Sequence, residues 1–291
     1  MEARRSPVGP DCGFIDLLAG RVTGLDRLMP PANMRDGSVL HAGRDLYYLW
    51  LDEAGGYLTA VDRRGRKGLV WFLAPERIAS WHVARPLLHA IKALSSATAW
   101  TPIHGASAAR NGRAILIVGP SGAGKSSIAM SCALAGWQHL GDDAVMVRAD
   151  PGRVAALYSS ARLRADTFVH FPRAMAASLG ISDDAGELKA EIDVGLLQPT
   201  ADGEAEVAAV VLLRRDGWNR LRVVPFRRST ALGHLLATTR QSLFGDEGVL
   251  FETLGRLLAS VPVYALDPGS DQLALTDCLA KLTENGGSAC A

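Results

Sequence analysis

The sequence predicts an α/β fold in which a nucleotide-binding domain follows a small β-rich domain. Residues 119–126 read Gly-Pro-Ser-Gly-Ala-Gly-Lys-Ser, a full match to the phosphate-binding loop pattern G-x-x-x-x-G-K-[ST]. An apolar run at 114–118 precedes this loop, and residues with helical spacing follow it, as a buried strand and a helix require. Residues 45–73 consist instead of short aromatic and branched runs separated by turn residues, which is typical of antiparallel strands.

The N-terminal part of the chain predicts a sheet followed by a helix. Strands are expected at 46–51, 57–61 and 68–73. Residues 79–96 have helical spacing, with Pro86 either opening or kinking the helix. We therefore expect a β-rich accessory domain at 1–100 and a P-loop domain at 101–291.

The P-loop domain predicts alternating strands and helices. Its strands are expected at 103–109, 114–118, 143–148, 154–158, 207–213, 220–225 and 262–266, and its later helices at 229–243, 248–260 and 272–282. The strands at 207–213 and 220–225 are expected to form a hairpin around Asp216-Gly217. The segment 176–206 contains scattered Gly, Asp, Pro and Glu, so we interpret it as the least regular part and a candidate mobile loop over the site.

Composition excludes several classes of partner. The 31 basic and 30 acidic residues leave a formal charge of +1, which gives no bulk attraction to nucleic acid or an anionic membrane. Cys12, Cys132, Cys278 and Cys290 lack metal-binding spacing and suit a reducing compartment. No signal peptide is expected from the N-terminal residues, and no run of 18 uninterrupted apolar residues occurs. We expect a cytoplasmic protein without a nucleic-acid or membrane partner.

The loop itself predicts binding of a nucleoside triphosphate and Mg²⁺. Backbone N–H groups of such a loop surround a polyphosphate at the N-terminus of the following helix. Lys125 can reach the β- and γ-phosphates, and the Ser126 hydroxyl can bind Mg²⁺. The nucleotide-binding residues expected on this basis are Gly119, Pro120, Ser121, Gly122, Ala123, Gly124, Lys125, Ser126 and Ser127.

Two adjacent carboxylates follow the loop helix. Asp142 and Asp143 come 17 and 18 residues after Lys125, beside an expected strand. Such a pair can divide two tasks, because one carboxylate can hold Mg²⁺ while the other accepts the proton of an attacking hydroxyl. The alternative is a turn in which one aspartate only caps backbone N–H groups.

His104 precedes Lys125 by 21 residues and lies on the strand before the loop strand. Asn111-Gly112 is a strong signal for a two-residue hairpin, which would bring His104 near the end of the loop strand. A site next to the phosphates would give this histidine a role in proton chemistry. The alternative is a hydrogen-bonded core histidine.

Together these residues resemble a known family. His104-Gly105, Asn111-Gly112, the loop, Gly136 and Gly141-Asp142-Asp143 are similar to the catalytic domain of the HPr kinase/phosphorylase family. They resemble still more its HPr-kinase-like relatives, which share an ancestry with ATP-dependent phosphoenolpyruvate carboxykinases. The resemblance covers residues 104–148. It implies a P-loop kinase domain of the HPr kinase/phosphoenolpyruvate carboxykinase type.

The resemblance also implies residue roles and a reaction. Lys125 would contact the phosphates of ATP, and Ser126 and Asp143 would bind Mg²⁺. The pair of Asp142 and Asp143 would supply the base for a serine hydroxyl, with His104 beside it. The acceptor would be a peptide or protein, and relatives that modify ribosomal peptide precursors make such a precursor a candidate. Because the parent family assembles as hexamers, a homo-oligomer stays open.

The sequence departs from the family downstream. It lacks the Gly-rich, Arg-containing segment tied to HPr recognition and to the reverse, phosphorolytic reaction. Arg162, Arg164 and Lys189 stand in that region as candidates for contacts with the γ-phosphate or the acceptor, the alternative being a solvated surface. Two other functions stay open, a kinase for a small-molecule hydroxyl and a nucleotide-binding regulatory protein that transfers no phosphate.

Overall fold

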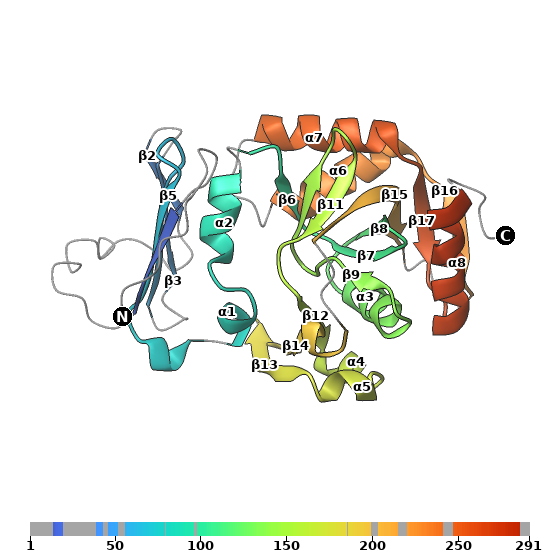
Figure 1. Ribbon diagram of the computed structural model, residues 1–291, viewed down its shortest axis with the longest axis horizontal. Helices are drawn as coiled ribbons and strands as arrows, with labels where there is room; N and C mark the ends of the chain where they lie inside the picture. Colours follow the sequence, from blue (N-terminus) through green and yellow to red (C-terminus); the bar gives the residue numbers. More distant parts are fainter. Residues whose placement is uncertain are drawn as a thin grey trace. The chain divides into compact units, whose positions relative to one another are not determined.

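The computed structural model describes residues 14–19, 39–42, 46–51, 56–78, 80–95, 98–184, 186–198, 203–214, 220–240 and 247–285. The chain divides into two compact units, Met1–Ala99 and Trp100–Ala291 (Figure 1). The first contains a five-stranded sheet, and the second is a mixed α/β unit with a central mixed sheet.

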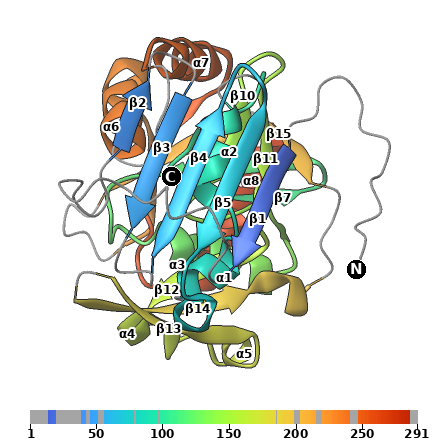
Figure 2. The same ribbon diagram turned by 90° about the vertical axis from the view of Figure 1, so that its left-hand side faces the viewer.

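The sheet of the first unit has the strand order β1-β5-β4-β3-β2 (Figure 2). Its strands are β1 (Phe14–Ala19), β2 (Val39–Ala42), β3 (Leu46–Leu51), β4 (Tyr57–Asp62) and β5 (Lys67–Phe72). The three strands expected from the sequence are confirmed as β3, β4 and β5, and they pair antiparallel. At the turn between β4 and β5 the Asp62 carboxylate accepts a hydrogen bond from the Gly65 N–H at 2.9 Å, which fixes the hairpin.

The helical region of this unit is interrupted at Pro86. A short 3₁₀ helix (Pro75–Arg77) is followed by α1 (Ser80–Ala84) and α2 (Leu88–Ser95), and Leu87 between them has a φ of 61°. Proline lacks the N–H of a helical hydrogen bond and disfavours a helical residue before it, so the helical segment expected at 79–96 is divided into two helices at Pro86. His82 of α1 packs 4.4 Å from the Tyr57 ring, and burial lowers its pKa to about 3, as for a neutral core histidine.

The sheet of the second unit has the order β6-β10-β11-β15-β8-β7-β9, and β17 pairs with both β15 and β16. The strands are β6 (Thr101–Ile103), β7 (Ala106–Arg110), β8 (Arg113–Val118), β9 (Gln138–His139), β10 (Val145–Arg148), β11 (Arg153–Ala156), β15 (Glu204–Leu213), β16 (Arg222–Pro225) and β17 (Val263–Asp267). The loop strand β8 runs parallel to β15, which runs parallel to β17. This parallel core is buried between two layers of helices, as parallel strands require.

Alternate residues of β8 face the two helix layers. Ile115 and Ile117 pack against α3 (Lys125–Leu134) and α8 (Gln272–Asn285), whereas Leu116 and Val118 pack against α6 (Arg228–Arg240) and α7 (Glu247–Ser260). Because both faces are covered, the strand reads as a continuous apolar run rather than an alternating one. The three expected late helices are thereby confirmed as α6, α7 and α8. No described helix has the length and apolar character needed to cross a membrane.

The predicted Asn-Gly hairpin is confirmed. β7 pairs antiparallel with β8, Arg110 lies opposite Arg113, and Asn111 and Gly112 both have positive φ, 53° and 76°. The strand expected at 103–109 is divided, since β6 pairs with β10 while β7 pairs with β8. His104-Gly105 forms the break.

Two strands of a separate three-stranded sheet lie in the segment 176–206, which was expected to be irregular. The sheet consists of β12 (Ser160–Arg164), β13 (Ser178–Asp184) and β14 (Glu187–Asp193), in the order β12-β14-β13, and is joined by α4 (Ala165–Phe168), α5 (Pro172–Met175) and a 3₁₀ helix (Val194–Leu196). The expected mobile loop at 176–206 is therefore wrong. Its charged residues alternate with apolar ones along β14, and the charges pair across strands instead of marking a loop.

The expected hairpin of 207–213 with 220–225 is also wrong. β17 lies between β15 and β16, and β16 pairs antiparallel with β17. The proposed turn at Asp216-Gly217 lies outside the described residues. Strands that follow one another in the chain are usually neighbours in the sheet. Here the chain continues from β16 through α6 and α7 to β17, and β17 lies between β15 and β16.

Candidate functional site

The phosphate-binding loop leaves the end of β8 and enters α3. Gly119 approaches β15 so closely that a Cβ there would lie 3.2 Å from the Leu213 backbone oxygen. Gly124, at the helix N-cap, has a φ of 107°, which a side chain would disfavour. The loop glycines thus permit a turn that presents backbone N–H groups at the N-terminus of a ten-residue helix.

The ammonium group of Lys125 is held against the first residues of the loop. It is only 6% exposed, and its Nζ donates to the carbonyl oxygens of Gly119 at 2.9 Å and Pro120 at 3.0 Å. Burial lowers the pKa of Lys125, and the nearby carboxylates of Asp142 and Asp143 act in the opposite direction. A buried ammonium group next to the backbone N–H groups of the loop binds phosphate oxygens strongly, because charge-assisted hydrogen bonds are stronger than neutral ones.

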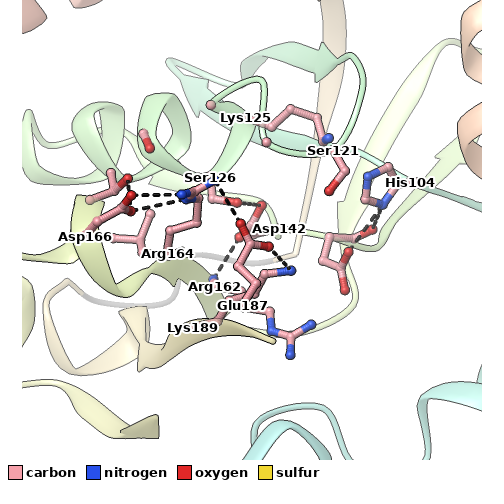
Figure 3. Close-up of a pocket in the computed structure, with 16 residues that line it drawn as sticks. His104, Ser121, Lys125, Ser126, Asp142, Arg162, Arg164, Asp166, Glu187 and Lys189 are labelled. Carbon is pink, nitrogen blue, oxygen red and sulfur yellow. Dashed lines mark hydrogen bonds and ion pairs between the residues drawn. The ribbon is translucent and has the colours of Figure 1, made fainter. Parts of the chain in front are cut away.

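Asp142 is held at both carboxylate oxygens. Oδ1 accepts a hydrogen bond from the Ser126 hydroxyl at 2.9 Å, and Oδ2 accepts one from the backbone N–H of Arg162 at 2.8 Å (Figure 3). The residue is 3% exposed. Its carboxylate is therefore fixed next to the loop rather than free to rotate.

Asp143 has a different environment. It adopts a φ of 65°, and its side chain is 35% exposed. The Nδ1 atom of His104 lies 3.1 Å from the Asp143 backbone oxygen and 3.2 Å from its Oδ1. Since both oxygens are acceptors, Nδ1 must carry a hydrogen, an assignment that follows from the donor chemistry of the pair. His104 thereby orients a carboxylate that remains accessible from the cavity.

The opposite side of the cavity is formed by the three-stranded sheet. Arg164 pairs with both carboxylate oxygens of Asp166, at 3.1 and 2.8 Å, and with Glu187 at 2.9 Å. Lys189 pairs with the other Glu187 oxygen at 3.0 Å. These ion pairs are exposed or half-buried, so Arg164 and Lys189 line the cavity while each is paired with an acidic side chain.

Arg162 belongs to a deeper pair. Its Nε lies 2.8 Å from Oε1 of Glu191, which is fully buried and also accepts a hydrogen bond from the Ser182 hydroxyl at 3.1 Å. β12 and β14 place Arg162 directly opposite Glu191. The backbone N–H of Arg162 binds Asp142, and the side chain of the same residue is held by the buried Glu191. The ion pair thus helps to fix the position of Asp142.

The cavity between these two sides has a volume of about 360 Å³ (Figure 3). Of the residues expected from the sequence, the structure brings together His104, Ser121, Gly122, Gly124, Lys125, Ser126, Ser127, Asp142, Asp143, Arg162, Arg164 and Lys189 in its lining. Gly119 and Pro120 contact Lys125 instead, and Ala123 is buried in the core below the loop.

Sequence reasoning missed Asp166, Glu187 and Glu191. Asp166 and Glu187 line the cavity, while Glu191 supports it from behind. The alternation of charged and apolar residues along 187–192 was an available signal for the strand. It could not show which cation each acid pairs with, because that depends on the register of β12 and β14.

The residues present fit a Mg²⁺ ion bound together with phosphates. The Ser126 hydroxyl and the Asp142 carboxylate, 2.9 Å apart, are oxygen ligands of the kind that Mg²⁺ prefers alongside water and substrate phosphates. Within the described part of the chain, no three His, Cys, Asp or Glu side chains gather to hold a metal alone. The geometry differs from the expected ligand set, since Asp142 and not Asp143 lies beside Ser126.

The chain was compared with family models, curated proteins and solved structures. No family model matches the chain, and no curated protein matches it. Among solved structures, the chain is similar to the Hpr(Ser) kinase/phosphatase from Coxiella burnetii at 14% identity and a TM-score of 0.30, over 62% of this chain and 89% of that one.

Proposed function

We propose that this protein is an ATP- and Mg²⁺-dependent kinase that transfers the γ-phosphate to a hydroxyl group, namely a serine of a peptide or protein. Residues 101–291 are the catalytic P-loop domain of HPr-kinase-like type, and residues 1–100 are an accessory domain. One observation carries the proposal. The adjacent carboxylates of Asp142 and Asp143 have separate partners beside the loop, one at Ser126 and one at His104.

Binding and charge neutralisation come first in this mechanism. The loop N–H groups and Lys125 hold the β- and γ-phosphates, and Ser126 with Asp142 supplies the metal ligands. A Mg²⁺ ion held there would neutralise charge on the phosphate oxygens. Most of the rate of phosphoryl transfer comes from such positioning and neutralisation, so little covalent chemistry is required of the protein.

Asp143 then acts as the general base. His104 orients the Asp143 carboxylate, which lines the cavity and would accept the proton of the incoming hydroxyl there. The hydroxyl oxygen forms a bond to the γ-phosphorus as the bond between that phosphorus and the β–γ bridging oxygen breaks, and ADP leaves. A nucleotide sensor would need the loop but no oriented base, so the contact between His104 and Asp143 supports transfer over sensing. The choice of a serine acceptor rests on the family resemblance of residues 104–148.

The test separates nucleotide binding from transfer. The full chain is incubated with γ-labelled ATP, Mg²⁺ and serine-containing peptides, and ATP affinity is measured by calorimetry. Asp143→Asn should lower transfer by about 10²- to 10⁴-fold, the usual contribution of a general base, and leave ATP affinity within about twofold. Asp277→Asn, an exposed aspartate on α8, is the matched control and should change neither quantity.

Three outcomes would count against the proposal. If wild-type protein binds ATP but labels no peptide, protein or alcohol acceptor, it is a nucleotide-binding regulator. If only small alcohols are labelled, the protein is a small-molecule kinase. If Asp143→Asn transfers phosphate at the wild-type rate, the base is assigned wrongly.

A further inference from the structure

A second cavity of about 570 Å³ adjoins the phosphate-binding loop at Pro120. We call it the β16–α6 groove, and its lining comprises Pro120, Leu212, Leu213, Arg214, Pro225, Phe226, Arg227, Thr230 and His234. These residues come from the loop, the end of β15, the end of β16 and the start of α6. The mechanism above assigns them no role beyond the contact of Pro120 with Lys125.

The groove has an apolar floor and a basic rim. Leu212 and Leu213 are buried, and Phe226 is half-buried with the Arg214 guanidinium 5.8 Å from its ring centroid. Arg214, Arg227 and His234 are exposed. Among the described residues that line the groove, none is Asp or Glu.

The basic character is local. The whole chain has a net charge of only +1, yet the exposed cations Arg220 and Arg228 lie just before β16 and at the start of α6, whereas Arg222 of β16 lies opposite Asp267. A local excess of cations on a nearly neutral protein attracts ligands of negative charge to that face. The apolar floor in addition provides burial for a hydrophobic side chain, which a free inorganic anion would not use.

The groove and the phosphate cavity adjoin at the loop, with Pro120 in the groove and Ser121 in the cavity. Pro120 is followed directly by Ser121, which lies near His104 on one side of Lys125, while Arg164 and Asp166 lie on the other side (Figure 3). The attacking hydroxyl must enter opposite the leaving ADP, on the side of the base. His104 and Asp143 lie on that side of the cavity, and Ser121 of the same cavity is followed back along the chain by Pro120 of the groove.

We propose that the β16–α6 groove docks an acidic segment of the acceptor polypeptide, with carboxylates on Arg214 and Arg227 and an apolar side chain on Leu212, Leu213 and Phe226. This inference rests on the proposed function for its choice of a polypeptide acceptor. Charge complementarity decides the occupant, because the base of a nucleotide would use the aromatic floor but not the cationic rim.

The experiment measures binding without turnover. Three short fluorescein-labelled peptides contain one serine and one leucine each, flanked by glutamates, glutamines or lysines, and their affinities are measured by fluorescence anisotropy. We expect the glutamate peptide to bind at least about tenfold tighter than the glutamine peptide, with the difference declining at high salt. The charge-reversal variant Arg214→Glu/Arg227→Glu should lose about tenfold in affinity for the glutamate peptide and gain affinity for the lysine peptide.

The matched control is Arg110→Glu/Arg173→Glu, which reverses two exposed arginines outside the groove and should retain the preference for glutamate. Three results would overturn the proposal: equal effects of the two double variants, a parallel loss of ATP affinity in the groove variant, or tighter binding of oligo-dT than of the glutamate peptide. The second result would assign the groove to the nucleotide, and the third to nucleic acid.

The two proposals can fail separately. If the glutamate peptide binds in the groove but no acceptor is ever phosphorylated, the kinase assignment fails and the groove assignment stands. If glutamate and glutamine peptides bind equally and are phosphorylated at the same rate, the kinase assignment stands and the groove assignment fails.

Discussion

The two sides of the phosphate cavity differ in how they are held. The loop side, formed by residues 119–126 with Asp142, is fixed by buried contacts, and Lys125 and Asp142 are only 6% and 3% exposed. The sheet side, formed by β12 and β14, presents ion pairs at the surface, with Arg164 and Asp166 side chains 49% and 64% exposed. The loop side is therefore arranged before a ligand arrives, whereas the sheet side must exchange partners.

The difference has an energetic consequence. A preorganised site needs no rearrangement when phosphate binds, so its interactions contribute fully to affinity and rate. Surface ion pairs contribute only about 0–1 kcal/mol, so their cations can leave an acid for a phosphate at little cost. We expect substitutions on the loop side to have large effects on binding and those on the sheet surface small ones, with the buried Arg162–Glu191 pair as the exception.

The largest effect is expected from substitution in the buried Arg162–Glu191 ion pair. Glu191→Gln leaves the Arg162 guanidinium without its carboxylate, and such a loss should destabilise β12 and β14 locally by about 3 kcal/mol. Hydrogen exchange of their backbone amides measures this change. Arg162→Leu/Glu191→Leu, which removes both charges, should be less destabilising. Equal exchange in Glu191→Gln and wild type would show that the pair contributes nothing.

The next effect tests the loop side directly. Lys125→Met keeps much of the side-chain volume but removes the ammonium, and ATP affinity should fall about 10- to 150-fold, the equivalent of about 1.5–3 kcal/mol for a charge-assisted hydrogen bond. Calorimetry with ATP and Mg²⁺ measures it. Lys281→Met on exposed α8 surface is the control. A change of less than threefold in Lys125→Met would contradict a preorganised loop side.

The smallest effect is expected on the sheet surface, where the substitution should strengthen ATP binding rather than weaken it. Glu187 competes with a ligand for Arg164 and Lys189, so Glu187→Gln should remove this competitor while Asp166 still pairs with Arg164, and ATP binding should strengthen by about two- to fivefold, within the range of a surface ion pair. The gain should shrink as salt is raised. Weaker ATP binding in Glu187→Gln would mean that the acid orients the cations rather than competing for them.

Local patterns predicted the parts of the site that depend on short stretches of chain. The Asn111-Gly112 hairpin and the strand, loop and helix around 114–134 follow from backbone preferences over a few residues. The same kind of evidence failed at 176–206, where scattered Gly, Asp and Pro indicated a loop. Charged residues of β14 in this segment pair with those of β12, which lies earlier in the chain, and a pattern within one segment cannot show its partner strand.

The sequence by itself determined that a phosphate cradle, two adjacent carboxylates and a histidine occur at fixed intervals, because each is a matter of residue type and spacing. Only the tertiary structure decided that Asp142 lies beside Ser126 and Asp143 beside His104. Neighbouring residues can face different ways, and here the positive φ of Asp143 directs its side chain to His104 while β12 holds Asp142. The placement of β17 between β15 and β16, which puts the β16–α6 groove next to Pro120, likewise depends on contacts between segments far apart in the chain.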